Sequence, residues 1–155
     1  AIFGVELTVQ YLKPMVQFLQ MLGGEYDGDI DSDTEARVRF GQDSVFVMES
    51  RSTNVEKQGY GSVHHFALRV KDEAALKEIQ DRVFADKWRS SGIVDRHYFK
   101  ALYISAVGNI TVEISTDTPG FTIDEPLETL GENLSLPPFL EENRDFIEMR
   151  LHPLN

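Results

Sequence analysis

One order of secondary structure occurs twice along this chain, and it limits the fold more than any other feature. Residues 2–9 alternate apolar and polar side chains, which is typical of a strand with one buried face. From Pro14 apolar residues recur at helical spacing, and Gly23 and Gly24 favour the end of that helix. Short strands are then expected at 25–30, 35–40 and 44–48. The first 50 residues therefore predict one βαβββ unit.

The same order returns after a polar linker at 50–61. Residues 63–70 alternate as a strand, and Asp72 is a suitable N-cap for a second amphipathic helix. Three further strands are expected at 91–99, 101–105 and 110–115. The sequence thus predicts an α+β domain over residues 1–116. Its units, at 1–50 and 62–116, form a curved mixed sheet with helices outside.

Residues 117–155 have a different character. They contain five of the six prolines, and they carry nine Asp or Glu residues against Arg144 and Arg150, which is a net charge of −7. Apolar residues are too frequent here for a disordered tail, and 141–151 has the pattern of a helix. We expect an acidic, proline-containing C-terminal extension that packs on the domain.

Composition excludes several classes of partner. With 26 acidic residues, 15 Lys and Arg, and a net charge of −11, nucleic acids and anionic membranes are poor partners. We find no apolar run long enough to cross a bilayer, and no signal-peptide pattern precedes the first strand. The absence of cysteine excludes thiolate metal sites and fits the cytoplasm. Because the first residue is Ala1, we expect a processed or fragmentary N-terminus.

Strand alternation selects one His and one Glu. In the strand at 63–70, His64 shares the apolar face, whereas His65 points to the opposite face. In the strand at 110–115, Glu113 likewise points away from the apolar face. If these strands are neighbours, imidazole and carboxylate converge as they do at a divalent metal. A hydrogen-bonded surface histidine and a solvated glutamate explain the same pattern, and two ligands make only half a site.

Four stretches give the chain a resemblance to a known family. They are GSVHHFALRV at 61–70, VDRHYFKALYI at 94–104, GNITVEISTDTPGFTIDEPLETLG at 108–131 and LPPFLEENRDFIE at 136–148. They resemble the vicinal oxygen chelate superfamily, which includes glyoxalases, bleomycin resistance proteins and dioxygenases. More closely, they resemble the C-terminal domain of its ring-cleaving dioxygenases of the hydroquinone type.

The resemblance implies an incomplete iron site. Such proteins have two domains with four βαβββ units, and they bind one Fe(II) through two His and one Glu. The second His corresponds to His65 and the Glu to Glu113, whereas Gly4 stands at the place of the first His. A third protein ligand is therefore expected from a missing N-terminal domain. Mn(II) is the alternative metal.

The resemblance also assigns roles around the metal. His64 would support the metal ligand beside it, while Arg96 and Tyr103 match positions that contact or polarise the substrate. Taken singly, each residue has an alternative to a role at the substrate: Arg96 could form a surface ion pair, and Tyr103 could pack against a neighbouring strand. Three open metal positions would accept a small aromatic diol and dioxygen side by side.

The expected function is the C-terminal domain of an Fe(II)-dependent, extradiol-type ring-cleaving dioxygenase in aromatic compound degradation. The isolated chain is expected to be inactive or weakly active. One alternative is a glyoxalase-like isomerase or lyase that works at a homodimer interface, against which Gly4 argues. Another is a non-catalytic binding domain of the same fold.

Overall fold

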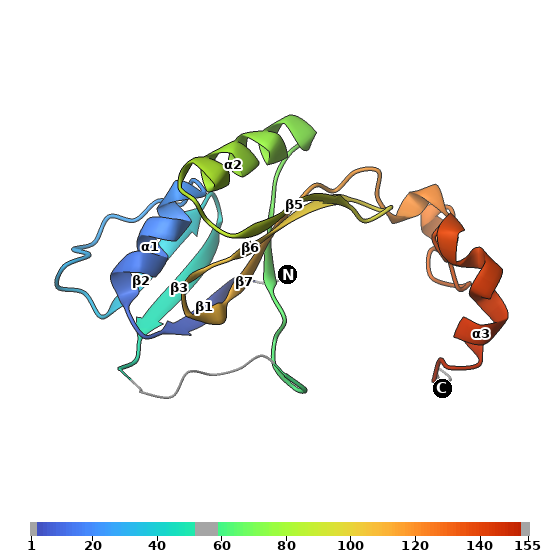
Figure 1. Ribbon diagram of the computed structural model, residues 1–155, viewed down its shortest axis with the longest axis horizontal. Helices are drawn as coiled ribbons and strands as arrows, with labels where there is room; N and C mark the ends of the chain where they lie inside the picture. Colours follow the sequence, from blue (N-terminus) through green and yellow to red (C-terminus); the bar gives the residue numbers. More distant parts are fainter. Residues whose placement is uncertain (1–2, 52–58, 153–155) are drawn as a thin grey trace.

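The computed structural model describes residues 3–51 and 59–152 of the chain. Ile2 of the expected first strand and positions 52–58 of the expected linker lie outside these ranges. Two helices and two mixed sheets form the body of the molecule (Figure 1). The predicted α+β class is confirmed, although hydrogen bonding divides the expected curved sheet into a three-stranded and a four-stranded sheet. Among the described residues, every helix is too short or too polar to span a bilayer.

The first unit forms the three-stranded sheet. Its elements are β1 Gly4–Val9, α1 Leu12–Met21, β2 Glu35–Phe40 and β3 Asp43–Glu49. The order is β1-β3-β2, with β1 parallel and β2 antiparallel to β3. Helix α1 packs on β2 and β3. It begins two residues before Pro14, which lies in the first turn where a missing N–H costs no helical hydrogen bond.

The expected strand at 25–30 is wrong, because only a single bridge between Glu25 and Arg39 forms there. The Asp33 carboxylate accepts the backbone N–H of Asp29 at 2.8 Å. It also accepts the hydroxyl of Tyr26, and this hydrogen bond raises the pKa of Tyr26 to about 12. Side-chain hydrogen bonds of this kind compete with a strand ladder for the backbone. The aspartate-rich segment is therefore a loop.

The second unit forms the four-stranded sheet. Its elements are β4 Phe66–Arg69, α2 Glu73–Ala85, β5 Ser90–Asp95, β6 Lys100–Ser105 and β7 Thr111–Ser115. The order is β4-β7-β6-β5, with β4 parallel to β7. Strand β5 ends before the expected position 99, since the Asp95 carboxylate accepts the N–H of His97 at 2.7 Å. His97 has a φ of 70°, and the chain turns there toward β6.

The predicted N-cap of α2 is confirmed, because the Asp72 carboxylate accepts the backbone N–H of Ala75 at 2.8 Å. We expect Asp72→Ala to lower the free energy of unfolding by about 1 kcal/mol, since it leaves a helix N–H without its partner. Urea denaturation measures the change. Glu78→Ala, on the exposed side of the same helix, is the control. A loss as small as that of the control would contradict the capping role.

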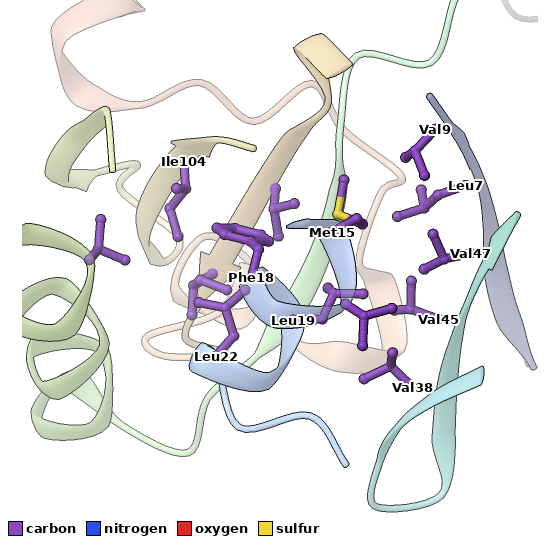
Figure 2. Close-up of a cluster of buried hydrophobic side chains, with 14 of the residues drawn as sticks. Leu7, Val9, Met15, Phe18, Leu19, Leu22, Val38, Val45, Val47 and Ile104 are labelled. Carbon is purple, nitrogen blue, oxygen red and sulfur yellow. The ribbon is translucent and has the colours of Figure 1, made fainter. Parts of the chain in front are cut away.

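One hydrophobic core joins the two units. Helix α1 contributes the fully buried Met15, Phe18 and Leu19. In Figure 2, Leu19 lies on the side of Val45 in the first sheet, whereas Phe18 lies on the side of Ile104 in the second. The core consists of side chains from residues 5–114 of this chain. The domain therefore closes its core without a partner chain.

Beyond β7 the chain leaves the body of the molecule. Figure 1 shows this segment, orange to red, at one end and away from α1 and the first sheet. It contains short 3-10 turns and one short helix, α3 Arg144–Glu148. The expected single helix at 141–151 is corrected to a 3-10 turn at Pro138–Asn143 followed by α3. Among the described residues of the extension, nine large apolar side chains from Phe121 to Leu151 are exposed.

Candidate metal centre

The register of the second sheet places two of the expected site residues, Glu113 and Tyr103, side by side. Glu113 in β7 lies directly opposite Ala67 of β4 and Tyr103 of β6. The expected strand at 63–70 is shortened to β4, so His65 lies one residue before the strand, and its contact with Glu113 places it on the same face. The neighbouring strand positions Val112 and Ile114 are buried in the core. Alternation thus directs Glu113 and its neighbours to the face away from that core.

His65 and Glu113 form a close pair. The Nε2 atom of His65 lies 2.7 Å from the Oε2 atom of Glu113. The Glu113 side chain is only 5% exposed, whereas the His65 side chain is 33% exposed. A buried carboxylate needs a compensating partner, and the imidazole supplies it. The pair therefore places a nitrogen and an oxygen donor close together. Solvent reaches them from the side of His65, which is the more exposed of the two residues.

His64 contacts the other nitrogen of His65. The two Nδ1 atoms are 2.7 Å apart, and the rings meet edge to face at 5.0 Å between centroids. One of the two nitrogens donates and the other accepts. This contact orients the His65 ring with Nε2 toward Glu113. A hydrogen bond to the second ring nitrogen is the usual support of a metal-ligating histidine.

Tyr103 and Arg96 lie beside this pair. The Tyr103 ring is 5.7 Å from the His65 ring, in an edge-to-face arrangement. Arg96 donates from Nε to the Tyr103 hydroxyl at 3.3 Å, and its guanidinium carbon lies 5.0 Å from the centre of the ring. The structure therefore gathers all five expected site residues on one side of the second sheet.

Ser91 is a neighbour of the site that the sequence analysis missed. Its hydroxyl accepts the backbone N–H of Tyr103 at 3.1 Å, next to an irregularity in the pairing of β5 with β6. Gly92, with a φ of 70°, provides the local bend. The run of Ser90, Ser91 and Gly92 inside a strand was the available signal, since glycine there often marks a bulge.

The first unit carries different residues at the corresponding positions. In its register Phe46 lies between Glu6 and Arg37, as Glu113 lies between Ala67 and Tyr103. Two residues before Glu6 is Gly4, where a Cβ atom would lie only 2.6 Å from the Ser44 carbonyl oxygen. No side chain fits there without movement of the backbone. Gly4 therefore has a steric role where the second unit has His65.

The donor set at His65 and Glu113 suits a divalent metal of intermediate hardness, because it combines imidazole and carboxylate. Within residues 3–51 and 59–152, no cluster of three His, Asp or Glu side chains is arranged to hold an ion. The pair fits a metal as two of its ligands. A cavity of about 290 Å³ adjoins it, between β1 and the segment from Ser62 to Phe66.

Comparisons with known proteins find similar proteins and structures, although no family model matches the chain. A protein of Bacillus subtilis (strain 168), "Putative ring-cleaving dioxygenase MhqA", is 38% identical over 97% of this chain and 50% of its own length. A solved structure described as a "putative dioxygenase from Bacillus subtilis subsp. subtilis str. 168" is 31% identical. Its TM-score is 0.83, with 97% of this chain and 49% of that chain covered. The chain belongs to the vicinal oxygen chelate superfamily.

One further solved structure and one further curated protein are similar to this chain. A glyoxalase/bleomycin resistance protein/dioxygenase domain from Frankia sp. EAN1pec has the same fold. It has 16% identity and a TM-score of 0.65, over 79% of this chain and 95% of that chain. The chlorohydroquinone/hydroquinone 1,2-dioxygenase of Sphingobium indicum is 34% identical over 65% of this chain and 32% of its own length. The chain described here spans half or less of the length of each of these two curated proteins.

Proposed function

We propose that this chain is one domain of an Fe(II)-dependent ring-cleaving dioxygenase, in which His65 and Glu113 are two of the metal ligands. The pair at 2.7 Å, with its carboxylate buried, is the observation that carries the proposal. Two ring-cleaving relatives above 30% identity support the reaction class. Mn(II) suits the same donors. The metal would supply adjacent binding positions for an aromatic diol and dioxygen, together with the capacity to exchange single electrons.

Tyr103 and Arg96 are proposed to bind the diol. Because the Tyr103 hydroxyl accepts a hydrogen bond from Arg96, its own hydrogen is available to donate to a substrate oxygen. The guanidinium beside it would stabilise negative charge on that oxygen. His64 would keep Nε2 of His65 directed at the metal, through the Nδ1 contact at 2.7 Å. Hydroquinone- or catechol-like diols are the proposed substrate class.

The third protein ligand is proposed to come from a second domain of the same polypeptide. Support comes from the relatives, which have at least twice the length of this chain. Within the chain, Gly4 faces a backbone oxygen that leaves no room for a ligand. An isomerase site shared by two copies would therefore bring together only the His and Glu pairs of each copy. The two-domain dioxygenase is the better supported function.

The test is oxygen consumption by the polypeptide of the complete reading frame, purified with Fe(II). Hydroquinone and catechol are the substrates, and ring-opened products are identified by mass spectrometry. We expect ring cleavage with one or both diols, and at most weak activity from the 155-residue chain alone. Iron-loaded protein that consumes no oxygen with either diol would contradict the proposal.

Tyr103→Phe is expected to lower kcat by about 100-fold, because the phenol supplies a proton or hydrogen bond during the reaction. Iron content should stay unchanged, since Tyr103 is not a proposed ligand. Steady-state oxygen uptake and metal analysis measure the two effects separately. Tyr11→Phe is the control, since Tyr11 lies at the start of α1 and lines a different cavity. Equal kcat values for the two variants would contradict the role of Tyr103.

A further inference from the structure

Residues 126–151, the C-terminal arm, carry much of the exposed apolar surface. Among the described residues, seven of the fifteen exposed large apolar side chains lie within the arm, and Phe121 and Ile123 lie just before it. Phe139 and Met149 are 74% and 78% exposed. Single exposed apolar residues are ordinary, but a concentration of them indicates a surface that another protein covers.

The arm has a defined internal structure. The Arg144 guanidinium donates two hydrogen bonds to Glu141 at 2.7 and 2.8 Å, and one to the Leu134 carbonyl at 3.0 Å. The Glu125 carboxylate accepts the backbone N–H of Gly131 at 3.1 Å. These bonds tie the polar groups to one another, while seven large apolar side chains of the arm stay exposed. The arm is therefore organised to present its apolar residues.

The root of the arm is attached to the body of the domain. The Phe121 ring lies 4.8 Å from the Tyr98 ring, and Gly120 donates to the Tyr98 carbonyl at 2.7 Å. The Tyr98 hydroxyl donates to Asp124, and this hydrogen bond raises the pKa of Tyr98. Beyond this point the arm extends away from the first sheet and α1 (Figure 1). A surface outside this domain is therefore needed to cover it.

We propose that the C-terminal arm packs on the second domain of the same polypeptide, on an apolar surface bordered by Lys and Arg. This inference rests on the two-domain function proposed above. The relatives supply the length argument, since a 38% identical protein and a 31% identical structure each contain about as many residues again. Because the arm extends away from α1 and the first sheet, it is placed to contact a neighbouring domain.

Charge decides between this partner and a second copy of the chain. Residues 117–155 carry nine acidic and two basic residues, or −7 of the total −11, which leaves −4 on residues 1–116. Two copies would therefore set an acidic arm against another acidic arm or an acidic body. Like charges across an interface oppose association. A domain with basic residues around an apolar patch is the complementary partner.

Hydrogen exchange tests the packing. The complete polypeptide is compared with the 155-residue chain, whose core is closed by its own residues. In the complete polypeptide, amides at 126–151 should exchange at least about tenfold more slowly. Equal exchange in the two proteins would overturn the proposal. A reading frame of only 155 codons, or protection of the arm in a dimer of the 155-residue chain, would also overturn it.

A matched pair of variants tests the apolar contact. Phe139→Ser should restore fast exchange of the arm in the complete polypeptide, whereas Glu142→Ser, on the same turn, should not. Neither change should alter the 155-residue chain, where both side chains are exposed. If the arm exchanges equally slowly in Phe139→Ser and Glu142→Ser, the proposed apolar contact is overturned. All exchange is measured on metal-free protein, so a failure of the iron site and a failure of the arm contact give separate results.

Discussion

Replacing His65 with alanine is expected to lower the affinity for Fe(II) or Mn(II) by about 100-fold or more. Loss of a supporting residue alone costs about 10- to 100-fold, and His65 is a proposed ligand. Glu113→Ala should have an effect of the same size. Competition with a chelator of known affinity measures the change in the complete polypeptide. His152→Ala is the control, since that residue is exposed in the extension.

A second variant separates metal binding from folding. In His65→Ala the nearly buried Glu113 carboxyl loses its polar partner, so the metal-free protein should also become less stable, by about 2 kcal/mol. Glu113→Gln keeps the shape and a hydrogen bond to His65, and it should weaken metal binding with little loss of stability. Wild-type metal affinity in both His65→Ala and Glu113→Gln would exclude the proposed centre.

The largest effect on stability is expected from Phe18→Ala, with a loss of about 4 kcal/mol of unfolding free energy. Phe18 is 1% exposed and meets the Trp88 ring edge to face at 4.8 Å. It connects the core of the first unit to that of the second, so its removal leaves a cavity where they join. Urea denaturation measures the loss.

The control for this substitution is Phe84→Ala, because Phe84 lies on α2 and is more than half exposed. Phe18→Leu provides a second variant that retains most of the volume, with an expected loss of about 1.5 kcal/mol. A loss in Phe18→Ala no larger than that of Phe84→Ala would show that the two units do not share one core.

The fold was predictable where local pattern and tertiary packing agree. The alternation at 2–9 and the cap at Asp72 both reflect short-range physics that the sequence displays directly. The strand at 25–30 was not predictable by alternation, because Asp29 and Asp33 bind the local backbone themselves. For the arm, apolar composition indicates burial against another surface, but it does not identify that surface.

For the candidate site, alternation selected the face of His65 and Glu113, and the family resemblance added Arg96 and Tyr103. The contact of Ser91 with Tyr103 depends on an irregular register between β5 and β6, which no period-2 pattern contains. The Nδ1 contact between His64 and His65 likewise depends on ring rotation that the sequence does not encode in its spacing. Distances of this kind emerge only after the strands are aligned.

The tight approach at Gly4 determines how this duplicated fold can be re-engineered. A second metal centre in the first unit would need a ligand at position 4, yet any side chain there meets the Ser44 carbonyl oxygen. Phe46 and Arg37 occupy the other two corresponding positions. Redesign must therefore begin by widening the gap between β1 and β3. Under directed evolution, single substitutions at position 4 are expected to be lost during selection for folding, before selection for metal binding acts on them.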